Sequence, residues 1–576
     1  MLRRMIVKPT VPSRDLLATL PNLKGLIDLQ RVVVVVGFGE VGPWGNARTR
    51  WEMEAYGEFS MEGCIELAWL TGRIKYHNGP LKGEDNTIHI GWVDSITGEA
   101  VQDSQVKSKY EDDMLLHAGI RVVEPDLFEG YDPFKKVFIH QVAIDRNMSP
   151  IEVPSKEEAE QYRRELGADA VDVYEEAGVW FIRLRRGAVL SIPKAMKFNR
   201  YVAGQIPTGW AAENFGIPKD IAESVDPATL FALVSVVEAL VSAGVCDPYE
   251  FYQYIHLSQV GNCVGSGMGG LRSLNRIYHL RRNGAAVPND SLQECFINTI
   301  PAWINMLLLS SCGPIKTPVG ACATAAESVE IGVETILSKK ARVVLVGGVD
   351  DFDEVGSYEF AQMGATADSE KETAKGRLPR EMSRPCSSTR GGFVESQGAG
   401  VQILMDAQLA LDMGCPIYAI VALTNTAMDK TGRSVPAPGQ GILSTAREEV
   451  GENRDIVQAL LNVEKRSQYL QEELEEAEEW MGRASKRARG RLSGRELEIE
   501  EAMIVEGGAR RKRAAQATWG QDFYHGNPGI APLRGALAVW GLTPDDVSVA
   551  SFHGTVINIY ISYLLNSKLS EGFTYL

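Results

Sequence analysis

The sequence has no apolar run long enough to cross a membrane. A spanning helix needs about 20 consecutive apolar residues. The best candidate, residues 230–245, is interrupted by Glu238, so we expect a buried core helix there and no membrane partner. Residues 1–17 carry positive charge without a following apolar segment, which excludes a secretory signal.

Paired cysteines and excess positive charge are also missing. The 8 cysteines form no CxxC pair and show no framework spacing, which argues against disulfides and against a zinc site. The 59 basic residues are outnumbered by 75 acidic ones, for a formal charge of -16. This balance argues against nucleic acid and anionic lipid as partners. We expect a reduced, cytoplasmic protein that holds no metal.

With 576 residues, the chain exceeds the usual length of one simple domain. Residues 1–30 contain three prolines and no sustained pattern, and we interpret them as a linker from an upstream domain. A buried strand and a turn follow at 31–45, and helical and strand-like segments alternate from 220 to 405. Between them, about 75–210 lacks a clear period and is typical of a large insertion.

The later part of the chain contains a second departure from the α/β pattern. Residues 415–428 predict a strand, and about 446–516 turns strongly charged, with acidic residues before basic ones at helical spacing. This spacing predicts a solvated helical excursion, or alternatively an arm that contacts another subunit. The pattern then resumes as a helix, a turn and a strand that leads to His553.

Cys322 is the candidate nucleophile. Small residues surround it in GACAT, and apolar residues then recur at helical spacing. If a helix begins near Cys322, free backbone N–H groups and the positive end of the helix dipole favour a thiolate. A buried strand at 341–352 follows and places the cysteine in a layered α/β core. The alternative is a small buried cysteine at a tight contact between helix and sheet.

Two weaker signals compete with this interpretation, and a histidine bears on it. Gly37–Gly42 fits the GxGxxG pattern of dinucleotide-binding turns, but Pro43 follows where a helix should already run. Cys263 lies in GNCVG, which is typical of a nucleophile elbow or equally of a glycine-rich turn. His553 precedes a glycine at a predicted strand end, which is a structural position or a catalytic one. Acyl transfer through a thiolate needs such a histidine.

Several segments together resemble the β-ketoacyl synthase region of the fungal fatty acid synthase α subunit. They are GACATAAES, VVLVGGVDDF, SRPCSSTRGGFVESQGAG, GRSVPAPGQGIL, VASFHGT, GNCVGSGMGG, VAGQIPTGW and VGPWGNARTRWEMEAYGEFSMEGC. The resemblance covers roughly residues 8–555. It implies a thiolase-like fold of two related α/β halves in five αβαβα layers. Its N-terminal half spans 31–405, and its C-terminal half spans 406–555.

The resemblance also implies an activity, which is decarboxylative condensation of malonyl-acyl-carrier protein with an acyl chain. Cys322 would carry that chain as a thioester, and His553 would stabilise the enolate during decarboxylation. The backbone N–H of Cys322 would form half of the oxyanion hole. The family's glycine-rich loop near the acyl tunnel matches Gly265, Ser266, Gly267 and Met268. Phe393 lies in the family's GF motif.

The family further implies the partners of this region. Substrates would arrive on the phosphopantetheine of an acyl-carrier protein, and the chain itself would hold no cofactor. The synthase regions would form a homodimer. The excursion at 446–516 would help to assemble a large complex with a fatty acid synthase β subunit.

The match to the family stops after Thr555. The family continues with a lysine and a second histidine, whereas residues 556–576 have no such motif. We therefore expect a C-terminally truncated synthase with an incomplete second half and an atypical tail that is not genuine coding sequence. Such a chain would condense poorly and have low solubility alone. Alternatives are a catalytically disabled remnant and, more remotely, an oxidoreductase that uses Gly37–Gly42.

Overall fold

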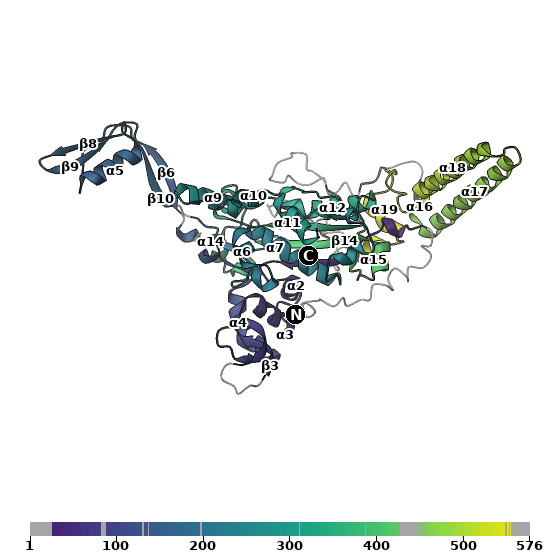
Figure 1. Ribbon diagram of the computed structural model, residues 1–576, viewed down its shortest axis with the longest axis horizontal. Coiled ribbons are helices and arrows are strands. Elements are labelled where there is room, and N and C mark those ends of the chain that lie inside the picture. Colours follow the sequence, from purple (N-terminus) through teal and green to yellow (C-terminus); the bar gives the residue numbers. More distant parts are fainter. Residues whose placement is uncertain are drawn as a thin grey trace. The chain divides into compact units, whose positions relative to one another are not determined.

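A five-stranded sheet forms the centre of the larger of two units in the computed structural model (Figure 1). The larger unit comprises Met1–Arg121, Ala203–Ala367 and Arg377–Leu576, and the smaller comprises Val122–Val202 and Asp368–Gly376. The structure describes residues 26–81, 88–128, 132–135, 137–195, 198–309, 311–385, 387–426, 447–449, 454–547, 550, 551 and 553.

The strand order of this sheet is β12-β13-β14-β1-β15. β12 runs parallel to β13, and the other neighbours are antiparallel. The strands span Val260–Asn262 (β12), Val343–Asp350 (β13), Gly398–Asp406 (β14), Val33–Val41 (β1) and Ala419–Ile420 (β15). Segments from three distant parts of the sequence therefore meet in one sheet.

Two helices cover opposite faces of this sheet, α7 (Pro227–Ser242) and α12 (Thr324–Leu337) (Figure 1). Successive side chains of a strand point to opposite faces, so each strand contributes to two cores. The core with α7 includes Val34, Val36, Val343, Leu345, Ile403 and Met405. The core with α12 includes Val33, Val344, Val346 and Leu404. The predicted buried helix at 230–245 and the predicted helix after Cys322 are both confirmed.

β1 runs through Gly37 and Gly39, the first two glycines of the GxGxxG pattern. A Cβ atom on Gly37 would lie 2.3 Å from the carbonyl oxygen of Ala239, and one on Gly39 would lie 2.1 Å from that of Ser235. Both carbonyls belong to α7, which therefore approaches the strand too closely for any larger residue. The pattern reflects strand-to-helix packing, and these two glycines do not form a phosphate-binding turn.

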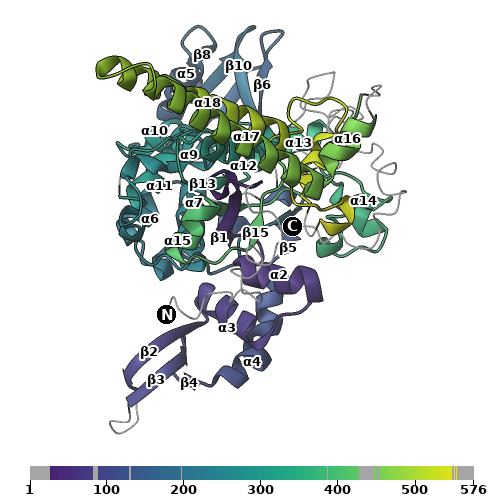
Figure 2. The ribbon, with the colours of Figure 1, turned by 90° about the vertical axis from the view of Figure 1, so that its right-hand side faces the viewer.

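The charged stretch near the C-terminal end of the chain is helical, as its spacing predicts. It forms α16 (Arg454–Leu461), α17 (Val463–Arg489) and α18 (Arg495–Trp519). α17 and α18 run side by side in both views (Figure 1, Figure 2). A Cβ atom on Gly508 would lie 2.0 Å from the Met481 sulfur, so the two helices pack closely there.

One sequence prediction is wrong in extent. Of the described part of the strand predicted at 415–428, residues 415–426, only β15 is a strand, and it pairs with Val34 and Val35 of β1. Residues 550 and 551 lie in no strand. The motif at 432–443, most of the predicted linker at 1–30 and the predicted tail at 556–576 lie outside the described residues.

The region predicted as an insertion contains regular structure. Its first part, in the larger unit, comprises β2 (Ile74–Pro80), β3 (Ile88–Asp94), β4 (Ala100–Val101) and α4 (Asp103–Leu116), preceded by α2 (Ala47–Tyr56) and α3 (Met61–Leu70). The smaller unit contains β6 (Val137–Ala143), β7 (Ile151–Val153), α5 (Lys156–Leu166), β8 (Val171–Glu176), β9 (Val179–Leu184), β10 (Val189–Ala195) and α14 (Ser369–Ala374).

Further helices complete the larger unit around the central sheet. They are α6 (Lys219–Ser224), α8 (Tyr249–Tyr252), α9 (Leu271–Arg282), α10 (Ser291–Glu294), α11 (Thr299–Leu307), α13 (Glu354–Gln362), α15 (Ala407–Met413) and α19 (Pro532–Val539).

Candidate active site

Cys322 lies in a single 3-10 turn, Ala321–Ala323, which leads directly into α12. The cysteine is exposed, in contrast to the alternative of a buried structural cysteine. No side chain caps the N-terminus of α12. The first backbone N–H groups of a helix lack intrahelical acceptors and attract negative charge. A thiolate or an oxyanion at Cys322 would therefore be favoured at this position.

The residue before the cysteine has an unusual backbone. Ala321 adopts φ 49°, in the left-handed region that side chains with a Cβ seldom enter. Within the part of the chain that is described, the backbone N–H of Cys322 donates to no carbonyl. The turn therefore presents an exposed sulfur and a free N–H donor together, which is the arrangement that an oxyanion hole requires.

The glycine-rich loop at Gly265–Met268 is folded around the carboxylate of Asp350. That carboxylate accepts hydrogen bonds from Ser266 Oγ (2.8 Å) and from the backbone N–H groups of Gly267 and Met268 (both 3.0 Å). Burial raises the pKa of Asp350, while these hydrogen bonds lower it. Asp350 ends β13, so the loop is fixed to the central sheet.

The same loop packs against the segment that carries Cys322. A Cβ atom on Gly265 would lie 2.4 Å from the Pro318 carbonyl oxygen, and one on Gly267 would lie 3.0 Å from the Ala321 carbonyl oxygen. Only glycine allows so close an approach of the two backbones. The structure thus brings together Cys322 and the glycine-rich loop at Gly265–Met268.

Asp351, directly after β13, holds α9, the helix that follows the glycine-rich loop. Asp351 forms an ion pair with Arg272 of α9 at 2.7 Å and accepts a hydrogen bond from Gln397 at 2.8 Å. Burial raises the pKa of Asp351 to about 6, and Arg272 opposes the rise. These aspartates had no predicted role. The signal was present as two acidic residues directly after a buried strand.

Burial and the charge of Glu327 act on the pKa of His553 in opposite directions. Partial burial of the imidazole lowers the pKa of His553, and the negative charge of Glu327 raises it. The residue as a whole remains exposed, so solvent still reaches the ring. Glu327 lies in the first turn of α12, five residues after Cys322, and the catalytic role of His553 stays a prediction.

Cys263 has a different environment from Cys322. It is fully buried, and burial raises the pKa of its thiol to about 11. Its backbone carbonyl accepts a hydrogen bond from Ser328 Oγ of α12 at 2.6 Å. An inaccessible thiol that stays protonated at neutral pH is a poor nucleophile.

The other two residues implied by the resemblance, Met268 and Phe393, lie in different surroundings. Met268 is 42% exposed, so its side chain is free to contact a ligand. Phe393 bridges to Thr366 and packs edge-on against Phe360 at 5.4 Å between ring centroids. The structure therefore shows what holds Phe393, and its role at the site stays a prediction.

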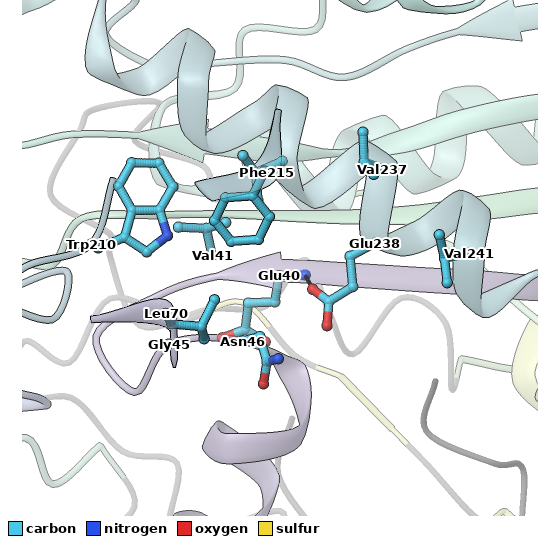
Figure 3. A pocket seen from close by; sticks show the side chains of 11 residues that line it. Glu40, Val41, Gly45, Asn46, Leu70, Trp210, Phe215, Val237, Glu238 and Val241 are labelled. Atoms are coloured by element: carbon cyan, nitrogen blue, oxygen red, sulfur yellow. Dashed lines mark hydrogen bonds between the residues drawn. The ribbon is translucent and has the colours of Figure 1, made fainter. Parts of the chain in front are cut away.

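A small cavity of about 20 Å³ lies elsewhere, between β1, the turn after it and α7 (Figure 3). Its lining includes Glu40, Asn46, Trp210, Phe215 and Glu238, and none of the residues of the candidate site. The Glu238 carboxylate accepts a hydrogen bond from the backbone N–H of Glu40 at 2.6 Å, and burial raises the pKa of Glu238 to about 8. This volume suits roughly one water molecule.

Comparison with known proteins accounts for this geometry. The family model of the β-ketoacyl synthase N-terminal domain matches residues 184–410. This part of the chain is similar to β-ketoacyl synthases. The matched range of that domain includes Cys322, the loop at Gly265–Met268 and Phe393. It excludes β1, although β1 pairs with β14 inside the sheet, so the folded domain extends beyond the matched range.

The whole chain is similar to fungal fatty acid synthase α subunits. It is 54% identical to the subunit of Candida albicans over 95% of this chain and 30% of that protein. It is 55% identical to the subunit of Saccharomyces cerevisiae over 93% of this chain and 28% of that protein. The chain therefore spans about three tenths of the length of the curated relatives that it matches.

A solved structure supports the thiolase-like fold. The ketosynthase FabY of P. aeruginosa superimposes with a TM-score of 0.59 at 20% sequence identity, over 75% of this chain and 65% of that one. At this level of identity, the likeness shows that the fold is shared. The β-ketoacyl synthase fold expected from the sequence is thereby confirmed.

The described residues offer neither a membrane span nor a metal-binding cluster. No helix there is both long enough and apolar enough to span a bilayer. No group of three or more histidine, cysteine, aspartate or glutamate side chains is placed there to hold a metal ion.

Proposed function

We propose that this chain supplies the condensing site of a fatty acid synthase, a 3-oxoacyl-acyl-carrier-protein synthase. The observation that carries the proposal is the position of Cys322. Its thiol is exposed at an uncapped helix start, beside a free backbone N–H and a glycine loop that is fixed by Asp350. The β-ketoacyl synthase domain in residues 184–410 supports the same chemistry.

In the first half-reaction, the Cys322 thiolate attacks the carbonyl carbon of an acyl thioester. The bond from that carbon to the carrier sulfur breaks, and the carrier thiol leaves with the proton that Cys322 gave up. The negative charge that develops on the carbonyl oxygen is stabilised by the free N–H of Cys322. One such donor typically contributes about 10²- to 10³-fold in rate.

In the second half-reaction, a malonyl thioester loses CO2, and the electron pair of the broken bond forms an enolate. His553 stabilises the enolate oxygen. The enolate carbon attacks the acyl group on Cys322, which expels the Cys322 thiolate and leaves a 3-oxoacyl thioester. Met268 is exposed on the loop beside Cys322 and would contact the entering acyl chain. Phe393, in the same domain, would pack near that loop and help to hold it.

We propose the partners on the basis of the relatives' names. Both substrates would arrive on the phosphopantetheine of an acyl-carrier protein, and the site needs no cofactor of its own. The named relatives are α subunits, so a synthase β subunit would assemble with the protein in the cytoplasm. A homodimer of synthase regions would be the local unit.

Acylation of Cys322 tests the proposal directly. The natural full-length protein would be incubated with an acyl-acyl-carrier-protein thioester and analysed by peptide mass spectrometry. We expect one acyl group on Cys322, none in C322A and normal acylation in C263A, since Cys263 is buried. Acylation without condensation, when malonyl thioester is added, would indicate a synthase remnant. Absence of any acyl group on Cys322 would refute the proposal.

A further inference from the structure

Thr324 is the first residue of α12 and lies two residues after Cys322. Its side chain is buried. The hydroxyl oxygen accepts a hydrogen bond from the backbone N–H of Gly320 at 2.9 Å, and the hydroxyl donates one to the carbonyl of Ala321 at 2.7 Å. A backbone N–H can only donate and a carbonyl can only accept, so both roles of the hydroxyl are fixed. One side chain therefore binds both residues that precede Cys322.

The Ala321 carbonyl is held by more than this hydroxyl. It also accepts a hydrogen bond from the backbone N–H of Thr324. The glycine loop borders the same oxygen, because a Cβ atom on Gly267 would lie 3.0 Å from it. Ala321 has a φ of 49°, and a residue with a Cβ keeps such a backbone only where its surroundings enforce it. The contacts of the carbonyl supply that enforcement.

The direction of the Ala321 carbonyl decides the direction of the Cys322 N–H. Both groups belong to one planar trans peptide unit, so they point in opposite directions. The carbonyl points towards Thr324 at the start of α12, and the N–H therefore points away from it. Among the described residues, this N–H donates to no backbone carbonyl. A bond to the carbonyl thus fixes the donor without occupying it.

A hydrogen bond from a helical threonine to a carbonyl three or four residues earlier is common and often only structural. Thr335 of α12 shows this ordinary case. Its hydroxyl donates to the Ile331 carbonyl at 2.6 Å and accepts from Lys316 Nζ at 2.8 Å. Thr324 differs, because its carbonyl partner belongs to the peptide whose N–H is the candidate oxyanion donor.

We propose that Thr324 is a positioning residue that sets the direction of the oxyanion donor of Cys322. The inference rests on the proposed condensing function, in which this N–H stabilises the carbonyl oxygen of the thioester. The Thr324 hydroxyl acts through the Ala321 carbonyl and touches no substrate. It holds the peptide before the thioester arrives, so the donor needs no reorganisation when negative charge develops.

Two reactions of Cys322 separate this role from plain support of the helix. Acyl transfer from an acyl-acyl-carrier-protein thioester develops charge on a carbonyl oxygen. Alkylation by iodoacetamide forms a carbon–sulfur bond and expels iodide without an oxyanion. The natural full-length protein would be compared with T324V, which replaces the hydroxyl by a methyl group, and with T324S, which keeps the hydroxyl. T335V is the matched control, because it removes an equally buried hydroxyl from the same helix.

We expect T324V to slow acyl transfer at saturating thioester about tenfold with little change in KM, since a misdirected donor loses part of its contribution. Alkylation of Cys322 should keep the wild-type rate. T324S should restore most of the acyl transfer, and T335V should match the wild type in both reactions. T324A carries the same expectation as T324V and replaces it if the valine prevents folding.

Three results would overturn the inference. Equal slowing of acyl transfer and alkylation would mean that the hydroxyl supports the cysteine and not the donor. Wild-type acyl transfer in the variants without the hydroxyl would remove its role altogether. Acyl transfer in T324S as slow as in T324V would show that the hydroxyl is not the group that matters. Failure of the proposed function has a different signature, because the wild-type protein would then accept no acyl group on Cys322.

Discussion

A methyl group at Gly265 would test how the glycine loop supports the nucleophile. The residue is fixed on both sides, since its N–H donates to the Gly347 carbonyl at 3.1 Å and its carbonyl accepts from the Val349 N–H at 3.0 Å. Its φ lies outside the left-handed region, so alanine is not excluded by the backbone. The obstacle is space, because the new Cβ would lie 2.4 Å from the Pro318 oxygen and 2.7 Å from Thr324 Cγ2.

The size of the effect follows from these distances. Ordinary contacts of a Cβ begin near ~3.4 Å, so Pro318 and Thr324 would have to move by about 1 Å. Overpacking of a close-packed interior costs roughly 1–3 kcal/mol, and we expect G265A to lose about 2 kcal/mol of unfolding free energy. Pro318 and Thr324 flank Cys322, so the displaced segment is the one that carries the nucleophile. Acylation of Cys322 should therefore slow more than stability alone would require.

Gly400 provides a matched control in β14 of the same sheet. A Cβ on Gly400 would meet nothing within 4 Å, so G400A should change stability by less than about 1 kcal/mol. Urea unfolding would give the stability of both variants, and mass spectrometry would give the rate of Cys322 acylation. A G265A variant with the urea midpoint and the Cys322 acylation rate of the wild type would refute the close approach of the loop to the segment that carries the nucleophile.

Three further predictions concern other sites. Burial raises the pKa of Glu238 to about 8, so between about 4.5 and 8 the unfolded chain ionises this carboxyl while the folded chain keeps it protonated. Stability should therefore fall as pH rises across that range, and E238Q should flatten the urea midpoints measured there. Arg466 is fully buried and donates to three backbone carbonyls. R466M should therefore lower the free energy of unfolding in urea by about 3 kcal/mol. R483A removes an exposed i,i+4 ion pair and should lower it by under ~1 kcal/mol. Iodoacetamide at pH 7.5 should label exposed Cys322 and spare buried Cys263, as peptide mass spectrometry would report, and the opposite order would contradict the site.

Local patterns predicted much of the fold because they depend on neighbours in the sequence. The apolar spacing after Cys322 predicted α12, the valine-rich run predicted β13, and the run interrupted by Glu238 predicted α7. Each of these elements buries one or two apolar faces, and such faces are visible as periodicity. The charged helices α17 and α18 were visible for the same reason.

The errors and omissions arose where distant segments decide the outcome. Gly37 and Gly39 matched a nucleotide-binding pattern, but the approach of α7 from some 200 residues away explains them. The strand predicted at 415–428 shortened to two residues because its pairing depends on β1. The hydrogen bonds of Thr324 to Gly320 and Ala321 are local in sequence, yet nothing in the residue types shows that the hydroxyl folds back over the turn.

The end of β13 explains why the site has a defined shape. Asp350 holds the glycine loop and Asp351 holds Arg272 of α9. Asp353 accepts from the Gly356 N–H at the start of α13 and from the side chain of Asn275. Burial raises the pKa of both Asp350 and Asp351, so the fold loses free energy by keeping charge there. Apolar residues would pack at lower cost but could not fix backbone N–H groups at 3.0 Å. The three carboxylates therefore favour a single arrangement of loop and helices beside Cys322, which is the precision that acyl transfer requires.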